Sequence, residues 1–233
     1  MDGNGRWAEG KAWARLQGHE AGVEAVRDIT TAAASWGIKH LTLYAFSVEN
    51  WQRPKMEIAG LMRFLKRFLQ EELDTLLENR IRLKGLGDLE ALPADVLEVL
   101  RGVESATAHG DRMTLRLALS YGGRQEITHA AKALARDVAQ GTKKLDEVTV
   151  ESLTASLYDA DMPDVDLVIR TAGELRLSNF LLWQASYAEF SFSHVLWPDF
   201  RRHNLKEALE DFDHRVRKFG RVLNADAGGE KSV

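Results

Sequence analysis

The chain begins with residues whose types suit the binding of a metal ion and a phosphate group. The stretch reads Asp2, Gly3, Asn4, Gly5, Arg6 and Trp7. Glycine lets backbone N–H groups approach a ligand closely, and successive amides form a concave anion site. A carboxylate beside a bound phosphate commonly shares a hard cation with it, most often Mg²⁺. The stretch therefore predicts a metal–phosphate loop, although an Asn/Gly turn with an incidental Asp explains the spacing equally well.

A second polar cluster follows the apolar run at 40–46. Its members are Ser47, Glu49, Asn50, Trp51 and Arg53. Ser or Asn at this position could simply cap a following helix. Capping requires neither an indole nor a guanidinium, so the cluster favours a functional role.

A third cluster follows the apolar run at 164–170 and contains Arg170, Arg176 and Ser178. Guanidinium groups match phosphate oxygens with paired hydrogen bonds. A helix expected at 178–185 would favour the same anion through its N-terminus. The alternative is a pair of surface salt bridges. Arg170 directly follows two apolar residues, which argues against a fully solvated position for it.

Three further residues are weaker candidates. Arg15 and His19 lie four positions apart and share a helix face if the helix begins early enough. Such a histidine is more often a surface or core residue. Glu189 opens a short β-rich run, where a carboxylate paired with an arginine is the commoner explanation.

The apolar periodicity predicts the elements that position these clusters. We expect helices at 18–36, 53–79, 93–109, 122–140, 150–157, 178–185 and 205–219, and strands at 40–46, 81–86, 113–120, 164–170 and 189–192. Strands separated by helices indicate a parallel α/β sheet, in which ligands bind at the carboxyl ends of the strands. The apolar stripe of the helix at 53–79 is typical of a core, but it could equally wall a cleft for a long hydrocarbon.

Composition excludes several classes of protein. The 233 residues suffice for one domain or at most two, and without cysteine there is no disulfide, iron–sulfur cluster or cysteine nucleophile. A net charge of −4, with Lys and Arg spread along the chain, argues against nucleic acid as a partner. There is no long apolar run or signal peptide, so we expect a cytoplasmic protein.

Longer motifs carry a resemblance to a known family. They read MDGNGRWA at 1–8, FSVENWQRP at 46–54, LSYGGRQEI at 119–127, VDLVIRTAGELRLSNFLLWQASYAEF at 165–190 and VLWPDF at 195–200. In this order they resemble the cis-prenyltransferases, and within them the bacterial undecaprenyl diphosphate synthases. The resemblance implies a catalytic domain at 1–222 and a flexible tail at 223–233.

The resemblance also implies a fold, a reaction and partners. The fold is a single parallel sheet surrounded by helices, with an apolar tunnel. The reaction joins isopentenyl diphosphate units to an allylic diphosphate, typically farnesyl diphosphate, and gives a long cis-polyprenyl diphosphate. A homodimer is implied, for which 119–134 is a candidate interface, together with peripheral contact with the inner membrane face during product release.

Residue roles follow from the matched motifs. Asp2 would bind Mg²⁺ and assist departure of the diphosphate, and Glu189 would complete the metal site from the same chain or from across a dimer. Asn50 would be catalytic. The substrate-binding set would be Gly3, Asn4, Gly5, Arg6, Trp7, Arg15, His19, Ser47, Glu49, Trp51, Arg53, Arg170, Arg176 and Ser178.

The sequence departs from the family pattern at several places. Family members carry an apolar strand just before the opening motif, and this sequence starts at Met1, so we expect the sheet to lack a central strand. Leu175 stands at a usually polar position and Ala172 at a usual Gly or Ser. Small Ala45 and flexible Met113 would suit a long product.

Two other functions compete with chain elongation. A non-catalytic subunit on the same fold would lack the loop carboxylate and the arginines, which this chain has. A Mg²⁺-dependent phosphohydrolase would leave the apolar helix unexplained. The elongation hypothesis requires that the opening turn and the arginines after Ile169 converge at the mouth of one apolar channel.

Overall fold

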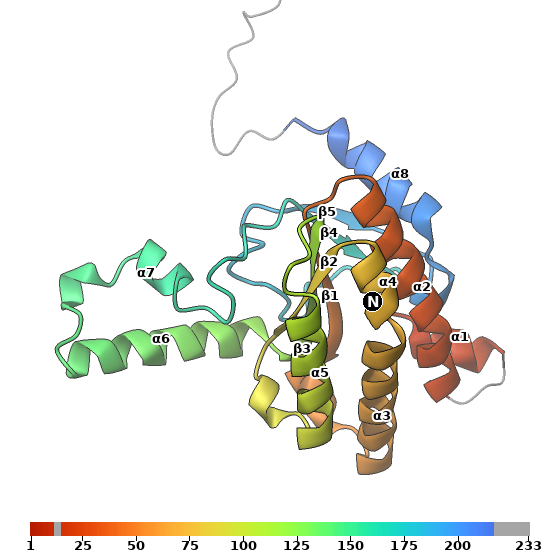
Figure 1. Ribbon diagram of the computed structural model, residues 1–233. Coiled ribbons are helices and arrows are strands. Elements are labelled where there is room, and N and C mark those ends of the chain that lie inside the picture. Colours follow the sequence, from red (N-terminus) through yellow and green to blue (C-terminus); the bar gives the residue numbers. More distant parts are fainter. Residues whose placement is uncertain (12–14, 217–233) are drawn as a thin grey trace, which may run out of the picture.

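The computed structural model describes residues 1–11 and 15–216; the side chains of residues 15–17 and 19 lie outside that description. Helices and strands alternate along the chain (Figure 1). The helices are α1 (Asn4–Gly10), α2 (Arg15–Ser35), α3 (Lys55–Glu71), α4 (Leu73–Glu78), α5 (Ala94–Ala106), α6 (Gly123–Ala139), α7 (Val150–Thr154) and α8 (Arg202–Asp213). The strands are β1 (His40–Ser47), β2 (Ile81–Leu86), β3 (Met113–Tyr121), β4 (Leu167–Arg170) and β5 (Glu189–Phe192).

All described strand pairs are parallel, but they form two ladders. One has the order β1–β3–β2, and the other consists of β4 and β5. The predicted parallel α/β class with surrounding helices is confirmed. Among the described strands β1 hydrogen-bonds only to β3 and β2 only to β3, while β4 hydrogen-bonds only to β5.

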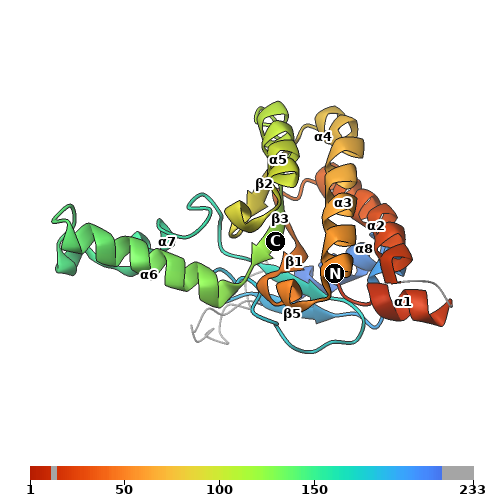
Figure 2. The same cartoon turned by 90° about the horizontal axis from the view of Figure 1, so that it is seen from below.

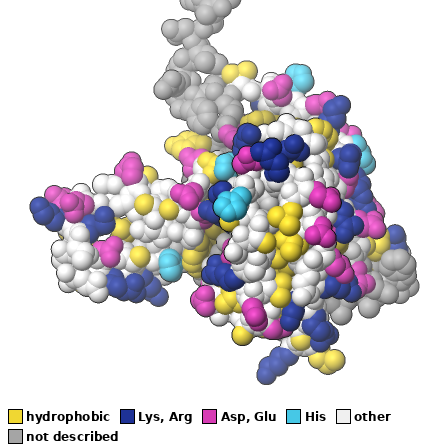
Figure 3. Space-filling view, in the orientation of Figure 1, with side chains coloured by type: hydrophobic (Ala, Val, Ile, Leu, Met, Phe, Trp, Pro, Cys, Tyr) yellow, Lys and Arg dark blue, Asp and Glu magenta, His cyan; other side chains and the backbone are white. Residues whose placement is uncertain are grey.

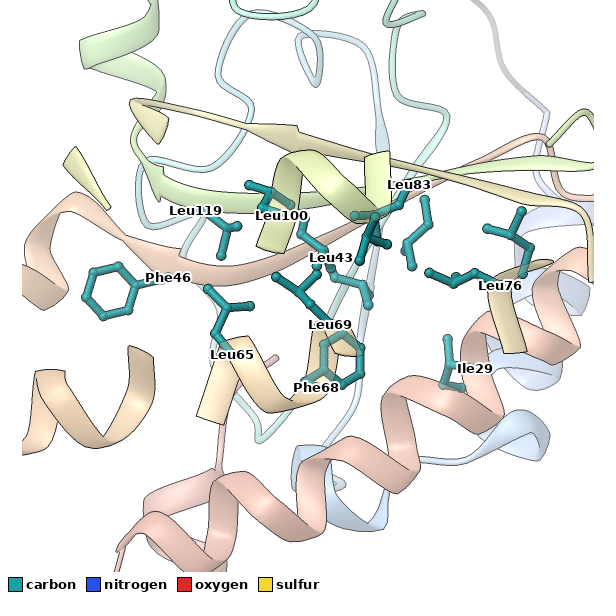
Figure 4. Close-up of a cluster of buried hydrophobic side chains, with 14 of the residues drawn as sticks. Ile29, Leu43, Phe46, Leu65, Phe68, Leu69, Leu76, Leu83, Leu100 and Leu119 are labelled. Carbon is teal, nitrogen blue, oxygen red and sulfur yellow. The ribbon is translucent and has the colours of Figure 1, made fainter. Parts of the chain in front are cut away.

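The main core lies between the three-stranded ladder and helices α2, α3 and α5. Figure 4 shows Leu65, Phe68 and Leu69 of α3 pointing toward Leu43 of β1 and Leu119 of β3. Strand β3 is buried along nearly its whole length because it is central. Figure 2 shows α3 and α5 lying together over one side of this ladder.

The predicted helix at 53–79 is in fact two helices. It begins at Lys55 rather than 53, since Pro54 has φ −53° and ψ 136° and the residue before a proline avoids the helical region. It breaks at Glu72, whose buried side chain accepts hydrogen bonds from Nε of Arg27 at 3.0 and 3.1 Å. The helical periodicity thus continues through a slight break, where Glu72 keeps hydrogen bonds to Phe68 at 3.0 Å and from Leu76 at 2.9 Å.

The predicted helix at 178–185 is wrong. Ser178, Asn179 and Leu181 all have positive φ, between 47° and 61°, so the segment is a series of turns. The Asn179 side chain accepts a hydrogen bond from the Arg124 N–H at 2.8 Å and donates to Glu49 at 3.1 Å. Contacts with two distant segments therefore override the local helical pattern, and no helix N-terminus faces the arginines here.

Helices α6 and α7 project from the body as an arm (Figures 1 and 2). On the face drawn in Figure 3, acidic and basic side chains are interspersed over the body and the arm. Helix α8 begins at Arg202, before the predicted 205, and the predicted tail lies outside the described residues. No helix in the described ranges is both long and apolar enough to cross a bilayer.

Candidate active site

A large cavity lies among β1, β4, α2 and α3. Its volume is about 1170 Å³, above the roughly 300–1,000 Å³ common for small-molecule pockets. Its apolar wall includes Ile29 of α2, Leu61, Leu65 and Phe68 of α3, and Leu117 of β3. The apolar stripe of α3 thus serves both the core and the cavity wall.

The predicted polar clusters converge on this one cavity. Its lining includes Asp2, Gly3, Asn4, Gly5 and Arg6 of the opening turn, Ser47, Glu49, Asn50 and Arg53 of the second cluster, and Arg170, Arg176 and Ser178 of the third. The spatial requirement stated for chain elongation is therefore met. Residues more than 160 positions apart share one cavity mouth beside an apolar wall.

The opening turn is held in place by its backbone. The Asp2 N–H donates to the Thr171 hydroxyl at 2.9 Å, that hydroxyl donates to the Asp2 carbonyl at 3.0 Å, and the Trp197 N–H donates to the same carbonyl at 2.9 Å. Gly3 has φ 105°, a conformation that favours glycine. A Cβ there would lie 2.9 Å from Leu196 Cδ2 and 3.1 Å from the Ala172 Cβ. These restraints leave the Asp2 side chain, 42% exposed, at the mouth.

Arg170 is the most enclosed cation at the mouth. Its side chain is 13% exposed, and its Nη2 lies 2.8 Å from Asp2 Oδ2. Its Nη1 donates to the Arg176 carbonyl. Its Nε is buried without a hydrogen-bond partner among the described residues. A guanidinium whose fork is not fully used is suited to a further anion, since buried donors are costly when unsatisfied.

The other two arginines meet at one carboxylate. Arg6 Nη2 lies 2.9 Å from Glu174 Oε1, and Arg176 Nη1 contacts Glu174 Oε2. Arg6 Nη1 also donates to the Ala172 carbonyl at 3.1 Å. Arg6, Arg170 and Arg176 thus bring three guanidinium groups to one part of the cavity, an arrangement that suits an anionic ligand.

The second cluster forms a short 3₁₀ turn, Val48–Gln52, after β1. The Asn50 side chain accepts a hydrogen bond from the Ser47 N–H at 3.0 Å and so closes this turn, but neither residue caps the long helix, whose N-cap position is Pro54. Burial tends to raise the pKa of Glu49, but hydrogen bonds from its own backbone, Ser47 and Asn179 outweigh it and hold that pKa below its usual value. Arg53 pairs with Glu57 at 3.1 Å.

Several predicted residues are not brought to the cavity. Trp7 is buried and donates to Asp199 at 2.8 Å, and Trp51 packs edge-on against Phe46 and donates to Ser120 at 3.0 Å. Neither lines the cavity wall. Helix α2 begins at Arg15, ahead of the predicted 18, and so includes both Arg15 and His19, but their side chains lie outside the described part.

Only one of the two residues expected to influence product length lies at the cavity. Ala45 lines the cavity, whereas Met113 is buried in the core at the start of β3 and is not part of the wall. The side chains of β3 that reach the wall come instead from further along the strand, at Leu117 and Leu119.

Asp2 and Glu189 do not form a metal site within one chain. Glu189 pairs in register with Leu167 at the start of β4, whereas Asp2 bonds to Thr171 just past its end. Four residues of strand separate those levels by roughly 13 Å. Glu189 instead lies 3.0 Å from Arg215. The described residues contain no cluster of three acidic or histidine side chains.

A single carboxylate nevertheless fits one kind of Mg²⁺ site. Mg²⁺ often keeps several waters and is held by one or two carboxylates together with substrate phosphates. The half-exposed Asp2 carboxylate beside Arg170 matches that arrangement. The donor set therefore suits a cation carried on a diphosphate, rather than one held by the protein alone.

Sequence reasoning missed three residues that build the site. Thr171 holds Asp2, Glu174 joins two arginines, and Asn179 ties the third cluster to the second. The signal for Thr171 and Glu174 was their place in the same post-strand turn as Arg170. The signal for Asn179 was concealed by the expectation of a helix.

Comparisons with known proteins identify the family. The family model described as "Putative undecaprenyl diphosphate synthase" matches residues 1–220. An isoprenyl transferase of Chlorobaculum tepidum is 51% identical over 224 residues, covering 95% of this chain and 84% of that protein. An isoprenyl transferase of Bacillus subtilis is 45% identical over 222 residues, covering 95% of this chain and 85% of that protein.

Solved structures agree with the sequence relatives. The structure of lavandulyl diphosphate synthase from Lavandula x intermedia, in complex with dimethylallyl diphosphate, is 35% identical with a TM-score of 0.92, covering 94% of this chain and 95% of that chain. A "probable undecaprenyl diphosphate synthase" from Campylobacter jejuni is 40% identical with a TM-score of 0.76, covering 86% and 92%. The chain thus belongs to the undecaprenyl diphosphate synthase family and is a prenyltransferase.

Proposed function

We propose that this prenyltransferase joins isopentenyl diphosphate units to an allylic diphosphate, such as farnesyl diphosphate, and yields a long cis-polyprenyl diphosphate. The observation that carries the proposal is the shared cavity, with three arginines and Asp2 at its mouth and apolar side chains of α2, α3 and β3 behind them. Two charged diphosphates and one growing hydrocarbon require this combination. The cis geometry rests on the family alone.

The chemistry needs no protein nucleophile. The C–O bond of the allylic diphosphate breaks, and the π electrons of isopentenyl diphosphate form the new C–C bond as that carbon becomes cationic. Loss of a proton from the adjacent carbon restores a double bond, and inorganic diphosphate is released. Arginines at fixed positions neutralise the departing charge, and holding both substrates in one orientation lowers the entropic cost of their meeting.

Each side chain at the mouth has an assigned task in this proposal. Arg6, with the backbone of Asn4 and Gly5, binds the allylic diphosphate, and Arg170, Arg176 and Ser178 bind that of isopentenyl diphosphate. Asp2 holds Mg²⁺ on a diphosphate, where the ion supplies additional neutralisation of the leaving charge. Arg170 orients the Asp2 carboxylate through its 2.8 Å contact.

Incubation with labelled isopentenyl diphosphate, farnesyl diphosphate and Mg²⁺ tests the proposal. We expect labelled lipid extractable into organic solvent and release of diphosphate. Asp2→Asn keeps the shape of the side chain and removes its charge, so we expect a loss of at least about 100-fold in turnover. Asp74→Asn, an exposed position on α4, is the matched control. Release of phosphate without lipid would favour a phosphohydrolase, and equal turnover of both variants would remove the role of Asp2.

Assembly is the second part of the proposal. We place a homodimer contact on the arm, in line with the candidate region 119–134, because α6 buries few of its own residues and the nearby Leu145 and Val150 are exposed. Glu189 would then act in the site of the partner copy. Sedimentation of the wild type and of a Leu145→Glu, Val150→Glu double variant tests this contact, with monomers expected for the variant.

The last part of the proposal concerns location. We propose that the protein works in the cytoplasm and touches the membrane only to release its apolar product.

A further inference from the structure

Glu174 occupies an unusual position for a carboxylate. It lies between Arg6 and Arg176, which come from the opening helix and from the turn after β4, and it gives one carboxylate oxygen to each. Its side chain is 22% exposed, whereas those of Arg6 and Arg176 are 50% and 66% exposed. The acid is thus the enclosed member of the group, and the two cations are the accessible ones.

The turn that carries Glu174 is firmly attached. Ala172 and Gly173 both have left-handed backbone conformations, with φ 67° and 69°, which reverse the chain just before Glu174. The Ala172 N–H donates to the Val195 carbonyl at 2.8 Å, and the Gly173 N–H donates to the Ser193 carbonyl at 2.9 Å. The carboxylate therefore belongs to a fixed backbone, unlike the long side chains that it contacts.

The contacts leave both guanidinium groups able to bind more. A guanidinium has five N–H donors in a planar fork. The bonds to Glu174 and to the Ala172 carbonyl occupy one edge of Arg6 and fix its plane. The remaining N–H groups of Arg6 and Arg176 stay available to oxygens of an anion at the cavity mouth. Ordering a flexible arginine in advance reduces the entropy lost when a ligand binds.

We infer that Glu174 is a positioning residue that orients Arg6 and Arg176 together, and so couples the two diphosphate sites of the proposed reaction. The inference rests on the proposed function for the identity of the two ligands. Glu174 touches neither substrate in this role. Because it serves one arginine from each site, its loss weakens both sites at once, which the loss of either arginine alone does not do.

Steady-state kinetics of Glu174→Gln give the first test. Immobilising a long side chain is worth about 0.5–1.5 kcal/mol, so we expect KM to rise about 2- to 10-fold for each substrate. Turnover at saturation should change little, because orientation aids ground state and transition state alike. Glu71→Gln, which removes an exposed carboxylate 3.8 Å from Arg67 at the end of α3, is the matched control.

Double variants separate positioning from a general disturbance. In an Arg6→Ala background, Glu174→Gln should no longer raise KM for the allylic substrate but should still raise it for isopentenyl diphosphate. In an Arg176→Ala background the reverse should hold. Equal increments in every background, a change for one substrate only, or a fall in KM would each overturn the inference.

A binding measurement keeps the test independent of turnover. Inorganic diphosphate titrated calorimetrically into the protein should bind Glu174→Gln about 2- to 10-fold more weakly than the wild type or Glu71→Gln. Equal affinities of the three proteins would refute the role of Glu174. A wild type that makes no lipid but shows this difference would refute the proposed reaction and retain the positioning role.

Discussion

Replacement of Gly3 by alanine tests how strictly the opening turn is constrained. Gly3 has φ 105°, and an added Cβ would meet Leu196 at 2.9 and 3.0 Å and Ala172 at 3.1 Å. Two costs therefore combine: a left-handed backbone with a side chain, and overpacking against fixed neighbours. Asp2 is the adjacent residue, so any shift of the turn displaces its carboxylate from Arg170.

Two other glycines separate these costs. Gly37 has φ 84° and no atom within 4 Å of a built Cβ, so Gly37→Ala carries the conformational cost only, about 1 kcal/mol after the gain from a stiffer unfolded chain. Gly10 is helical with open space around it, so Gly10→Ala should stabilise by about 0.5–1 kcal/mol. Overpacking adds about 1–3 kcal/mol at Gly3, giving a total loss of about 2–4 kcal/mol.

Urea unfolding of the three variants and the wild type measures these differences in the free energy of unfolding, provided that its slope against urea concentration is the same for all four proteins. Turnover and affinity for inorganic diphosphate should fall for Gly3→Ala and stay near the wild type for Gly37→Ala. A Gly3→Ala protein that loses no more stability than Gly37→Ala would refute the claim that Leu196 and Ala172 hold the turn.

Three further predictions follow from individual contacts. Asp159→Asn leaves Arg116, with a side chain 2% exposed, without its carboxylate at 2.7 Å, so the free energy of unfolding should fall by about 3–5 kcal/mol in urea. Burial tends to raise the pKa of Asp159, but hydrogen bonds from Lys84 and Arg116 outweigh burial and lower that pKa. The stabilisation from the Asp159 carboxylate is therefore present above pH about 3.9 and is lost as the pH falls through the pKa of the folded state. An Asp159→Asn variant whose stability has the same pH profile as the wild type would contradict this. Ala172→Gly relieves a left-handed alanine with φ 67° and should raise the unfolding free energy by a few tenths to about 1 kcal/mol, and a loss of stability would count against strain at this turn. Ala45→Leu adds bulk to the cavity wall and should shorten the products seen by chromatography, whereas an unchanged length distribution would show that Ala45 does not limit growth.

Local pattern was enough to predict most of the fold. The runs at 40–46, 81–86 and 113–120 are strands because alternating or continuous apolar residues leave little choice, and 189–192 agrees with β5 at both ends. The predictions failed where distant contacts decide the backbone. The long helix has a slight break at Glu72, which pairs with Arg27, and hydrogen bonds to Asn179 unwind the expected helix after Arg176.

The sequence indicated which residues lie near the cavity when they follow strands, but it did not indicate the hydrogen-bond partners of individual side chains. Arg170 and Arg176, which follow β4, line one cavity with the cluster that follows β1, as expected of parallel strand ends, and Asp2 and Arg6 reach the same cavity from the opening turn. Nothing in the spacing of Trp7 or Trp51 shows that their indoles pack inward and bond to Asp199 and Ser120. Glu189 was grouped with Asp2 by the family resemblance, whereas the strand register shows that Glu189 lies beside Leu167 at the start of β4.

The separation of the two ladders affects where a hydrocarbon chain can lie in the cavity. The side of β1 away from β3 and the side of β4 away from β5 present peptide groups that no described residue pairs with. A hydrocarbon chain laid along those peptide groups would displace their water without offering a hydrogen bond in exchange, which is unfavourable. Apolar side chains of the wall, among them Ile29, Leu61, Phe68 and Ala45, offer a hydrocarbon tail a surface without that cost.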